Sequence, residues 1–162
     1  MQILLAPIAA ILVQPAILVL RFLPDYLLAP SPQSFPSGVG SFLLFVLIFT
    51  TAAVIFLGIP TFILLRKFNR DNWFSLGISG FLLSAVPVAF LYPQKRDGFS
   101  SGGNWHGKFV ETYIDGLPTN YEWLIYFENI FFYGLHGLIG ALVFYAVWRR
   151  LDQHKKFIKK YD

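Results

Sequence analysis

The fold of this chain is decided by residues 124–148, which read LIYFENIFFYGLHGLIGALVFYAVW. A helix needs about 20 mostly apolar residues to cross a bilayer, so this segment is long enough to span one. One face of the helix carries polar and small side chains at spacings of three and four, namely Tyr126, Asn129, Tyr133, His136, Gly137 and Gly140. Membrane helices turn such a face toward protein rather than lipid, so we expect the rest of the chain to supply its partner.

The composition is typical of a membrane protein. Hydrophobic residues make up 56% of the 162 residues and charged residues only 14%, whereas roughly a quarter of the residues of a soluble domain are charged. The formal net charge is +4. Most Lys and Arg residues flank apolar segments, as topology signals do, so we expect no nucleic-acid partner. Cysteine is absent, which excludes disulfides and thiolate metal sites.

Three further apolar segments precede this one, at residues 3–20, 42–65 and 73–92. The first begins without the basic charge of a signal peptide, so we interpret it as a retained helix that ends near Pro24. We therefore predict an all-α integral membrane protein, with four transmembrane helices in one compact bundle. Residues 1–162 would form a single transmembrane domain, and residues 149–162 a basic tail that continues the last helix along the membrane surface.

Positive charge sets the predicted orientation. Nine Lys and Arg residues lie in the turn after the second segment and in the C-terminal tail, whereas four lie in the other two connections. Cytoplasmic loops carry the excess of basic residues. We predict a multi-pass protein of the inner (plasma) membrane with both termini in the cytoplasm.

The longest connection, the 30-residue loop 93–122, would then lie outside. Residues 95–103 are rich in Gly and Ser and are predicted to be flexible. Residues 108–114 read KFVETYI, a β-forming sequence, and the Asp-Gly pair at 115–116 is a turn signal. We therefore expect a short strand or hairpin, and we predict that it recognises a partner through Trp105, Phe109, Glu111 and Tyr113.

Small residues predict where the helices meet. Gly77, Gly80 and Ser84 form one stripe at spacings of three and four, and Gly137 and Gly140 lie on the polar face of the last segment. Such residues allow two helix backbones to approach closely. We expect both stripes to be buried against other helices, with direct contact between the two as one arrangement.

Two ionisable residues lie inside the last segment. A histidine near the bilayer midplane is a candidate proton or ion site, but a neutral His136 bonded to Gln14, Thr50, Thr51 or Ser84 is the simpler interpretation. Glu128 either snorkels and pairs with Arg21, Lys95 or Lys108, or serves as a cation site. The other histidines lie outside the spans and on opposite sides of the membrane, so we expect no haem, metal site or other cofactor.

No catalytic motif is present, and no catalytic residue is predicted: there is no nucleophile elbow, His-Glu-x-x-His or phosphate-binding glycine loop. We predict a non-catalytic protein that binds membrane lipid and another membrane or periplasmic protein. It would act as an accessory subunit of a membrane complex or as an immunity-type protein against a membrane-active toxin. In gross layout the chain resembles the small polytopic immunity proteins for pore-forming bacteriocins, without a shared motif.

Two alternatives to partner binding stay open. The first is a small ion-coupled or proton-coupled transporter, or a channel component, that uses His136 and Glu128. The second is a membrane enzyme that acts on lipid with His136 as its base. Both need several polar groups to converge inside the membrane, and only the last segment offers more than isolated hydroxyls or amides.

Overall fold

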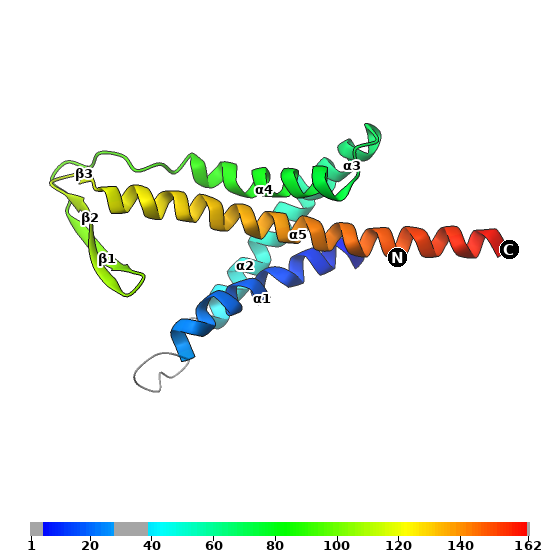
Figure 1. Ribbon diagram of the computed structural model, residues 1–162, viewed down its shortest axis with the longest axis horizontal. Helices are drawn as coiled ribbons and strands as arrows, with labels where there is room; N and C mark the ends of the chain where they lie inside the picture. The colour runs from blue at the N-terminus through cyan, green and yellow to red at the C-terminus, as the bar shows by residue number, and fades with distance from the viewer. Residues whose placement is uncertain (1–4, 28–38, 162) are drawn as a thin grey trace.

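The computed structural model describes the backbone of residues 5–27 and 39–161 and the side chains of residues 5–20 and 39–153. The described chain is mostly helical, with one small sheet (Figure 1). The helices are α1 (Leu5–Leu27), α2 (Val39–Ala53), the π-helical turn η2 (Val54–Gly58), α3 (Ile59–Lys67), α4 (Trp73–Ala89) and α5 (Asn120–Tyr161). The strands are β1 (Ser101–Trp105), β2 (Lys108–Ile114) and β3 (Leu117–Pro118).

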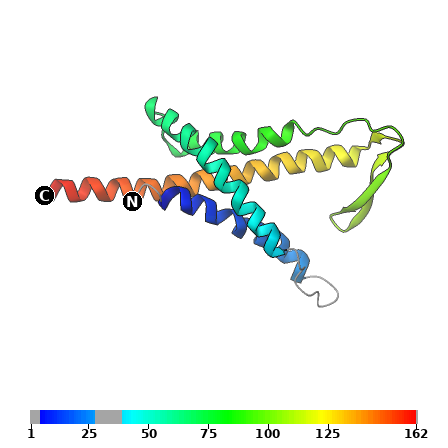
Figure 2. The ribbon, with the colours of Figure 1, turned by 180° about the vertical axis from the view of Figure 1, so that it is seen from behind.

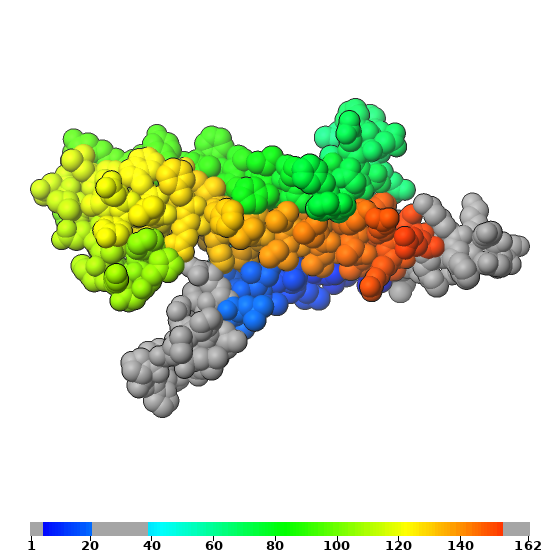
Figure 3. Space-filling model, viewed as in Figure 1, coloured from blue at the N-terminus to red at the C-terminus, as the bar shows by residue number. Residues whose placement is uncertain are grey.

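Helix α5 is the central element. It has 42 residues, or roughly 63 Å at a rise of about 1.5 Å per residue. Helix α4 runs beside it and α1 packs below it, while the rod formed by α2, η2 and α3 crosses behind (Figures 1 and 2). The space-filling view shows α4 covering one long side of α5 (Figure 3).

The start of α1, the α3–α4 turn and the C-terminal part of α5 lie at one end of the molecule, and the sheet lies at the other (Figure 1). The sequence predicted the same grouping of connections. The predicted N-cap of α4 is also confirmed, because Asn72 Oδ1 accepts the Ser75 backbone N–H at 2.9 Å. The basic tail was predicted to continue the last helix, and α5 does run on to Tyr161.

Two helices are long and apolar enough to cross a membrane, Val39–Lys67 and Asn120–Gln153. The other two predicted spans correspond to shorter apolar helices, Leu5–Leu20 and Trp73–Ala89. The long helix Val39–Lys67 contains Pro60, which has no N–H to donate and whose ring crowds the preceding turn. The wider π-helical turn just before it, in which the Ile59 N–H donates to Val54 O, accommodates that crowding.

Three expectations are wrong. The helices do not form a compact bundle, because α1 and α4 pack on α5 while α2 and η2 contribute no buried residue (Figure 2). Helix α1 continues beyond Pro24 to Leu27. Residues 101–105, at the end of the segment predicted to be flexible, form strand β1.

The predicted hairpin is confirmed. Strands β1, β2 and β3 form an antiparallel sheet in that order. Two tight turns join them, at His106-Gly107 (φ 49° and 82°) and at the predicted Asp115-Gly116 (φ 48° and 79°). Positive φ at both central residues matches the right-handed twist of the flanking strands. The Asn104 Oδ1 accepts the Gly107 N–H at 2.8 Å, which stabilises the first turn.

Candidate functional site

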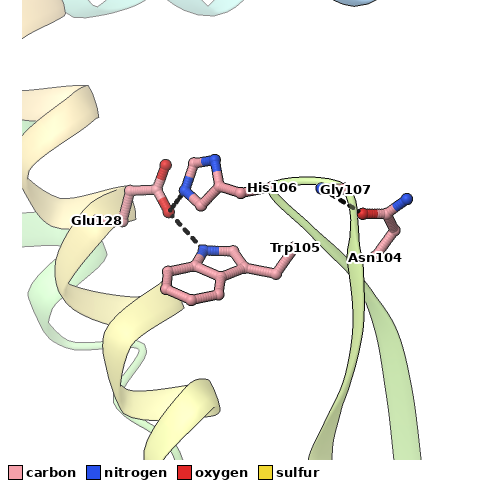
Figure 4. Close-up of polar contacts among 5 residues, drawn as sticks. All are labelled: Asn104, Trp105, His106, Gly107 and Glu128. Atoms are coloured by element: carbon pink, nitrogen blue, oxygen red, sulfur yellow. Dashed lines mark hydrogen bonds and ion pairs between the residues drawn. The ribbon is translucent and has the colours of Figure 1, made fainter.

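The tip of the hairpin is fastened to α5. Trp105 donates its indole N–H to Glu128 Oε2 at 2.8 Å, and His106 Nε2 lies 3.3 Å from the same oxygen (Figure 4). The Trp105 ring also packs edge-on against Tyr121, with ring centroids 5.6 Å apart. Hydrogen bonds to a charged group are the stronger ones, so this contact fixes the hairpin on the helix.

Glu128 therefore has partners that the sequence did not predict, Trp105 and His106. Lys95 pairs with Asp97 at 2.9 Å, and the side chain of Arg21 lies outside the described residues. The Glu128 side chain is 33% exposed. An indole N–H is an uncharged donor, so the distribution of positive charges in the sequence does not indicate it.

The two faces of the hairpin differ in exposure. Val110 and Tyr113 are 6% and 4% exposed, whereas Phe109 is 77% exposed and Glu111 is also exposed. Because side chains alternate between the two faces of a strand, Phe109, Glu111 and Tyr113 were expected on one face. A β-bulge breaks this alternation, because Ser101 pairs with Tyr113 and Gly102 with Glu111, leaving Thr112 as the extra residue.

Tyr113 was predicted to contact a partner, but its side chain is buried in this structure. Its ring packs edge-on against Phe99 at 5.4 Å, and the Arg96 guanidinium lies 5.4 Å from its centroid. Backbone bonds hold the segment before β1 against the second turn: the Arg96 N–H donates to Gly116 O at 2.8 Å, and the Gly116 N–H donates to Phe99 O at 2.7 Å. This part of the segment predicted to be flexible is thus tied to the sheet.

The second polar centre lies where α1 meets α5. Gln14 donates its Nε2–H to the backbone carbonyl of His136 at 3.1 Å, and the Gln14 Oε1 lies 2.8 Å from His136 Nδ1. Since the amide nitrogen is committed to a carbonyl, the amide oxygen is the acceptor and Nδ1–H the donor. Of the four predicted partners of His136, it is Gln14 that binds it, and Thr51 donates to Leu47 O within its own helix at 2.6 Å.

This arrangement leaves the other ring nitrogen of His136 unused. Among the described residues, Nε2 of His136 is buried and has no hydrogen-bond partner. With the proton on Nδ1, a neutral ring presents a lone pair at Nε2. The Phe132 ring packs edge-on against the imidazole at a centroid distance of 4.5 Å.

The polar face of α5 is covered only in part. Tyr126 donates its hydroxyl to Ala89 O at 2.6 Å and so satisfies a carbonyl at the end of α4. Asn129 is exposed and Tyr133 is 48% exposed, contrary to the expectation that this face meets protein. Helix α1 diverges from α5 toward its own C-terminal end (Figure 1).

The small residues lie in the closest helix contacts. A Cβ added to Gly80 would lie 2.6 Å from Ala141 Cβ and would overlap the Gly137 carbonyl oxygen. A Cβ added to Gly137 would overlap Gly80 O and the Ser84 hydroxyl, and one on Gly77 would lie 3.0 Å from Leu138. The two predicted stripes thus meet each other, except that Gly140 faces α1, where an added Cβ would lie 2.6 Å from Gln14 Nε2.

The two candidate residues Glu128 and His136 lie at different levels of α5 and contact different elements. Eight residues separate Glu128 from His136, which is about 12 Å of helix rise. One is bonded to the hairpin and the other to α1. Within the described residues there is no group of three or more His, Asp or Glu residues that could hold a metal ion.

Comparison of the chain with known protein families, with curated proteins and with solved structures finds no match.

Sequence reasoning missed the residues that order the segment before the hairpin and those that join α3 to α5. Arg96 and Phe99 were assigned to a flexible segment, although an arginine three residues before an aromatic ring suits a stacked turn. Phe62 packs against Phe144 and Trp148 at 4.9 and 5.0 Å, but nothing distinguishes it from the other phenylalanines of its apolar segment.

Proposed function

We propose that this chain is a multi-pass inner-membrane protein that binds a partner protein through its β-hairpin. The membrane assignment is supported by the rod Val39–Lys67, whose α2 and η2 parts have no buried residue. Phe45, Phe49 and Phe56 are 60%, 70% and 75% exposed along it. A contiguous apolar surface of this length requires an apolar environment.

The grouping of the chain's connections supports the proposed orientation. The basic α3–α4 turn lies at the same end as the start of α1 and the last part of α5, opposite the sheet (Figure 1). With basic loops on the cytoplasmic side, both termini are cytoplasmic and the hairpin lies outside. In this orientation α1 and α4 are the second pair of membrane-crossing helices.

The observation that carries the partner-binding proposal is the exposed ring of Phe109 on a fixed hairpin. The hairpin buries Val110 and Tyr113 on its inner side and is held to α5 by Trp105. Phe109 on the outer side is 77% exposed and Glu111 lies on the same face. Aromatic side chains are enriched at protein–protein interfaces, and a pre-organised hairpin lowers the entropy cost of binding.

A photo-crosslinking side chain at position 109, introduced into the full chain in its native membranes, tests the proposal. We expect one discrete protein adduct at this position. The matched control is position 49, which is similarly exposed but on α2, where only lipid adducts are expected. A folded protein that gives no protein adduct at position 109, or the same adducts at both positions, would refute hairpin recognition.

A partner-binding protein of this kind is an accessory subunit of a membrane complex or an immunity-type protein that blocks a membrane-active toxin. The two differ in their partner, so identification of the adduct by mass spectrometry separates them. An adduct with another membrane protein supports the accessory subunit, and an adduct with a secreted toxin supports the immunity-type protein.

One observation favours a second candidate, a proton-coupled transporter or channel component. The unpartnered Nε2 of His136 is a buried acceptor that a proton or water could use. Under the leading proposal, His136→Leu lowers stability and leaves the position-109 adduct in place. Under the second candidate, the same substitution in a folded protein abolishes pH-driven ion flux in proteoliposomes.

A further inference from the structure

The basic end of the molecule contains an ordered stack of two arginines and two aromatic rings. The Arg66 guanidinium of α3 lies 5.7 Å from the centroid of Trp148 on α5. The Arg149 guanidinium lies 5.7 Å from the centroid of Tyr145 and donates to its hydroxyl at 2.7 Å. The two rings are themselves 6.1 Å apart, so residues from two helices meet in one cluster.

The stack packs against a buried phenylalanine of α3. Phe62, one turn before Arg66, is 9% exposed and contacts both Phe144 and Trp148. Because these rings fix Trp148, the guanidinium above it is positioned by packing and not by an ion pair. Cation–π contacts within about 6 Å stabilise an arginine without using its N–H donors.

Both arginines have donors available for an anion. They are exposed, and in the described part of the chain neither forms an ion pair with a carboxylate. Lys67, Arg70 and Arg150 lie next to them in the sequence and are also exposed. The fork of a guanidinium matches a phosphate with two parallel hydrogen bonds, which an ammonium group cannot do.

The surroundings of the stack match the headgroup level of a bilayer. It lies at the end of the apolar rod Val39–Lys67, and Phe68, Trp73 and Phe74 next to it are 63%, 59% and 59% exposed. Tryptophan and other aromatic rings gather at this depth in membrane proteins. The anions within reach at this depth are lipid phosphates, and the two arginines disfavour the cationic headgroup of a zwitterionic lipid.

We propose that Arg66 and Arg149, stacked on Trp148 and Tyr145, form a binding site for the phosphate headgroup of an anionic phospholipid in the cytoplasmic leaflet. This inference rests on the proposed membrane location and adds a specific lipid class to it. The site joins α3 to α5, so a bound headgroup stabilises the contact between the exposed rod and the central helix.

Native mass spectrometry of the full chain in neutral maltoside micelles tests the site. The chain is titrated with dihexanoyl phosphatidylglycerol and, as the neutral counterpart, with dihexanoyl phosphatidylcholine. An arginine near the headgroup is worth about fivefold in affinity, so we expect the anionic lipid to bind about thirtyfold more tightly. Equal affinities for the two lipids would overturn the proposal whatever the variants do.

The variant Arg66→Gln with Arg149→Gln should lose this preference. Its charge-matched control, Lys95→Gln with Lys108→Gln at the hairpin end, should keep it. Arg66→Lys with Arg149→Lys retains the charge but not the fork of the guanidinium. Its preference for the anionic lipid should be about fivefold smaller than that of the unmodified chain. A preference that the lysine variant keeps in full, or that the control also loses, would mean that general charge and not the stack selects the lipid.

Inorganic phosphate at the same concentrations separates a lipid site from a site for a free anion. It should leave phosphatidylglycerol bound, and displacement by it would overturn the assignment to lipid. The failure of this inference is distinguishable from that of the proposed function. A chain that binds both lipids equally but still gives the position-109 adduct loses only the lipid site.

Discussion

Helix α5 and the α2–η2 segment are both apolar, but they differ in how closely other helices pack against them. Helix α5 is contacted by α4 on one side and by α1 on another. Residues 39–58 have no buried side chain, although seven of their apolar residues are large rings or branched chains with close to half or more of their surface exposed: Phe42, Leu44, Phe45, Ile48, Phe49, Ile55 and Phe56.

The glycines of the two segments differ in what they contact. In α5, Gly134, Gly137 and Gly140 recur every three residues and each lies against a neighbouring helix. In the α2–η2 segment, a Cβ added to Gly40 would meet nothing within 4 Å, and one on Gly58 would meet only its own helix. Lipid tails are as apolar as Leu or Phe, so large side chains gain little by leaving them, whereas glycines allow backbones to meet.

The largest effect should come from filling the closest of these contacts. Gly137→Leu places a side chain where Gly80 O and the Ser84 hydroxyl already lie, so α4 and α5 must separate. We expect a loss of about 4 kcal/mol in the free energy of unfolding, or no folded protein. Gly40→Leu is the control and should not destabilise. Equal thermal midpoints for the two variants in detergent would contradict the proposed role of the glycines.

An intermediate effect is expected from the contact between the rod and α5. Phe62→Ala removes the ring that packs against Phe144 and Trp148, and should cost about 3 kcal/mol. Phe49→Ala removes an equal ring that is 70% exposed, and should change stability by less than about 0.5 kcal/mol. Chemical denaturation in mixed micelles measures both, and a cost for Phe49→Ala as large as that for Phe62→Ala would show that the rod is packed along its whole length.

A smaller effect is expected at the Gln14–His136 contact. Gln14→Leu leaves the His136 Nδ1–H without its acceptor and should cost about 1–2 kcal/mol. Thr51→Val removes a hydroxyl bonded only to its own helix, so its cost should be about 0.5 kcal/mol or less. If the two variants unfold at the same denaturant concentration, the contact between α1 and α5 does not depend on this pair.

The sequence predicted the helices because their apolar segments are long and bounded by charges and prolines. It predicted β2 and the Asp115-Gly116 turn because that segment combines β-forming residues with a turn that requires positive φ. It also named Gln14 among four candidates for His136, since few polar side chains are available inside apolar segments.

What could not be predicted depends on contacts between distant segments. The bulge at Thr112 buries Tyr113 and is a property of two strands in register, not of one. The indole of Trp105 as a partner for Glu128 needs the hairpin to lie against α5. The divergence of α1 from α5 is a property of the two helices together, and no periodicity in α1 indicates it.

The central claim is that lipid covers most of the α2–η2 segment, whereas α4 and α1 pack closely against α5. The chain has no cysteine, so single cysteines can be placed and spin-labelled without a background. Collision rates with oxygen and with a water-soluble nickel complex should be measured in bilayers at successive positions of residues 42–58 and 132–146. We predict low nickel accessibility along the rod, with high oxygen accessibility everywhere except on the face that α1 contacts. In α5, oxygen accessibility should fall further, every three to four residues, with minima at Gly134, Gly137 and Gly140. Minima in the rod as deep as those in α5, or high nickel accessibility along it, would contradict the account.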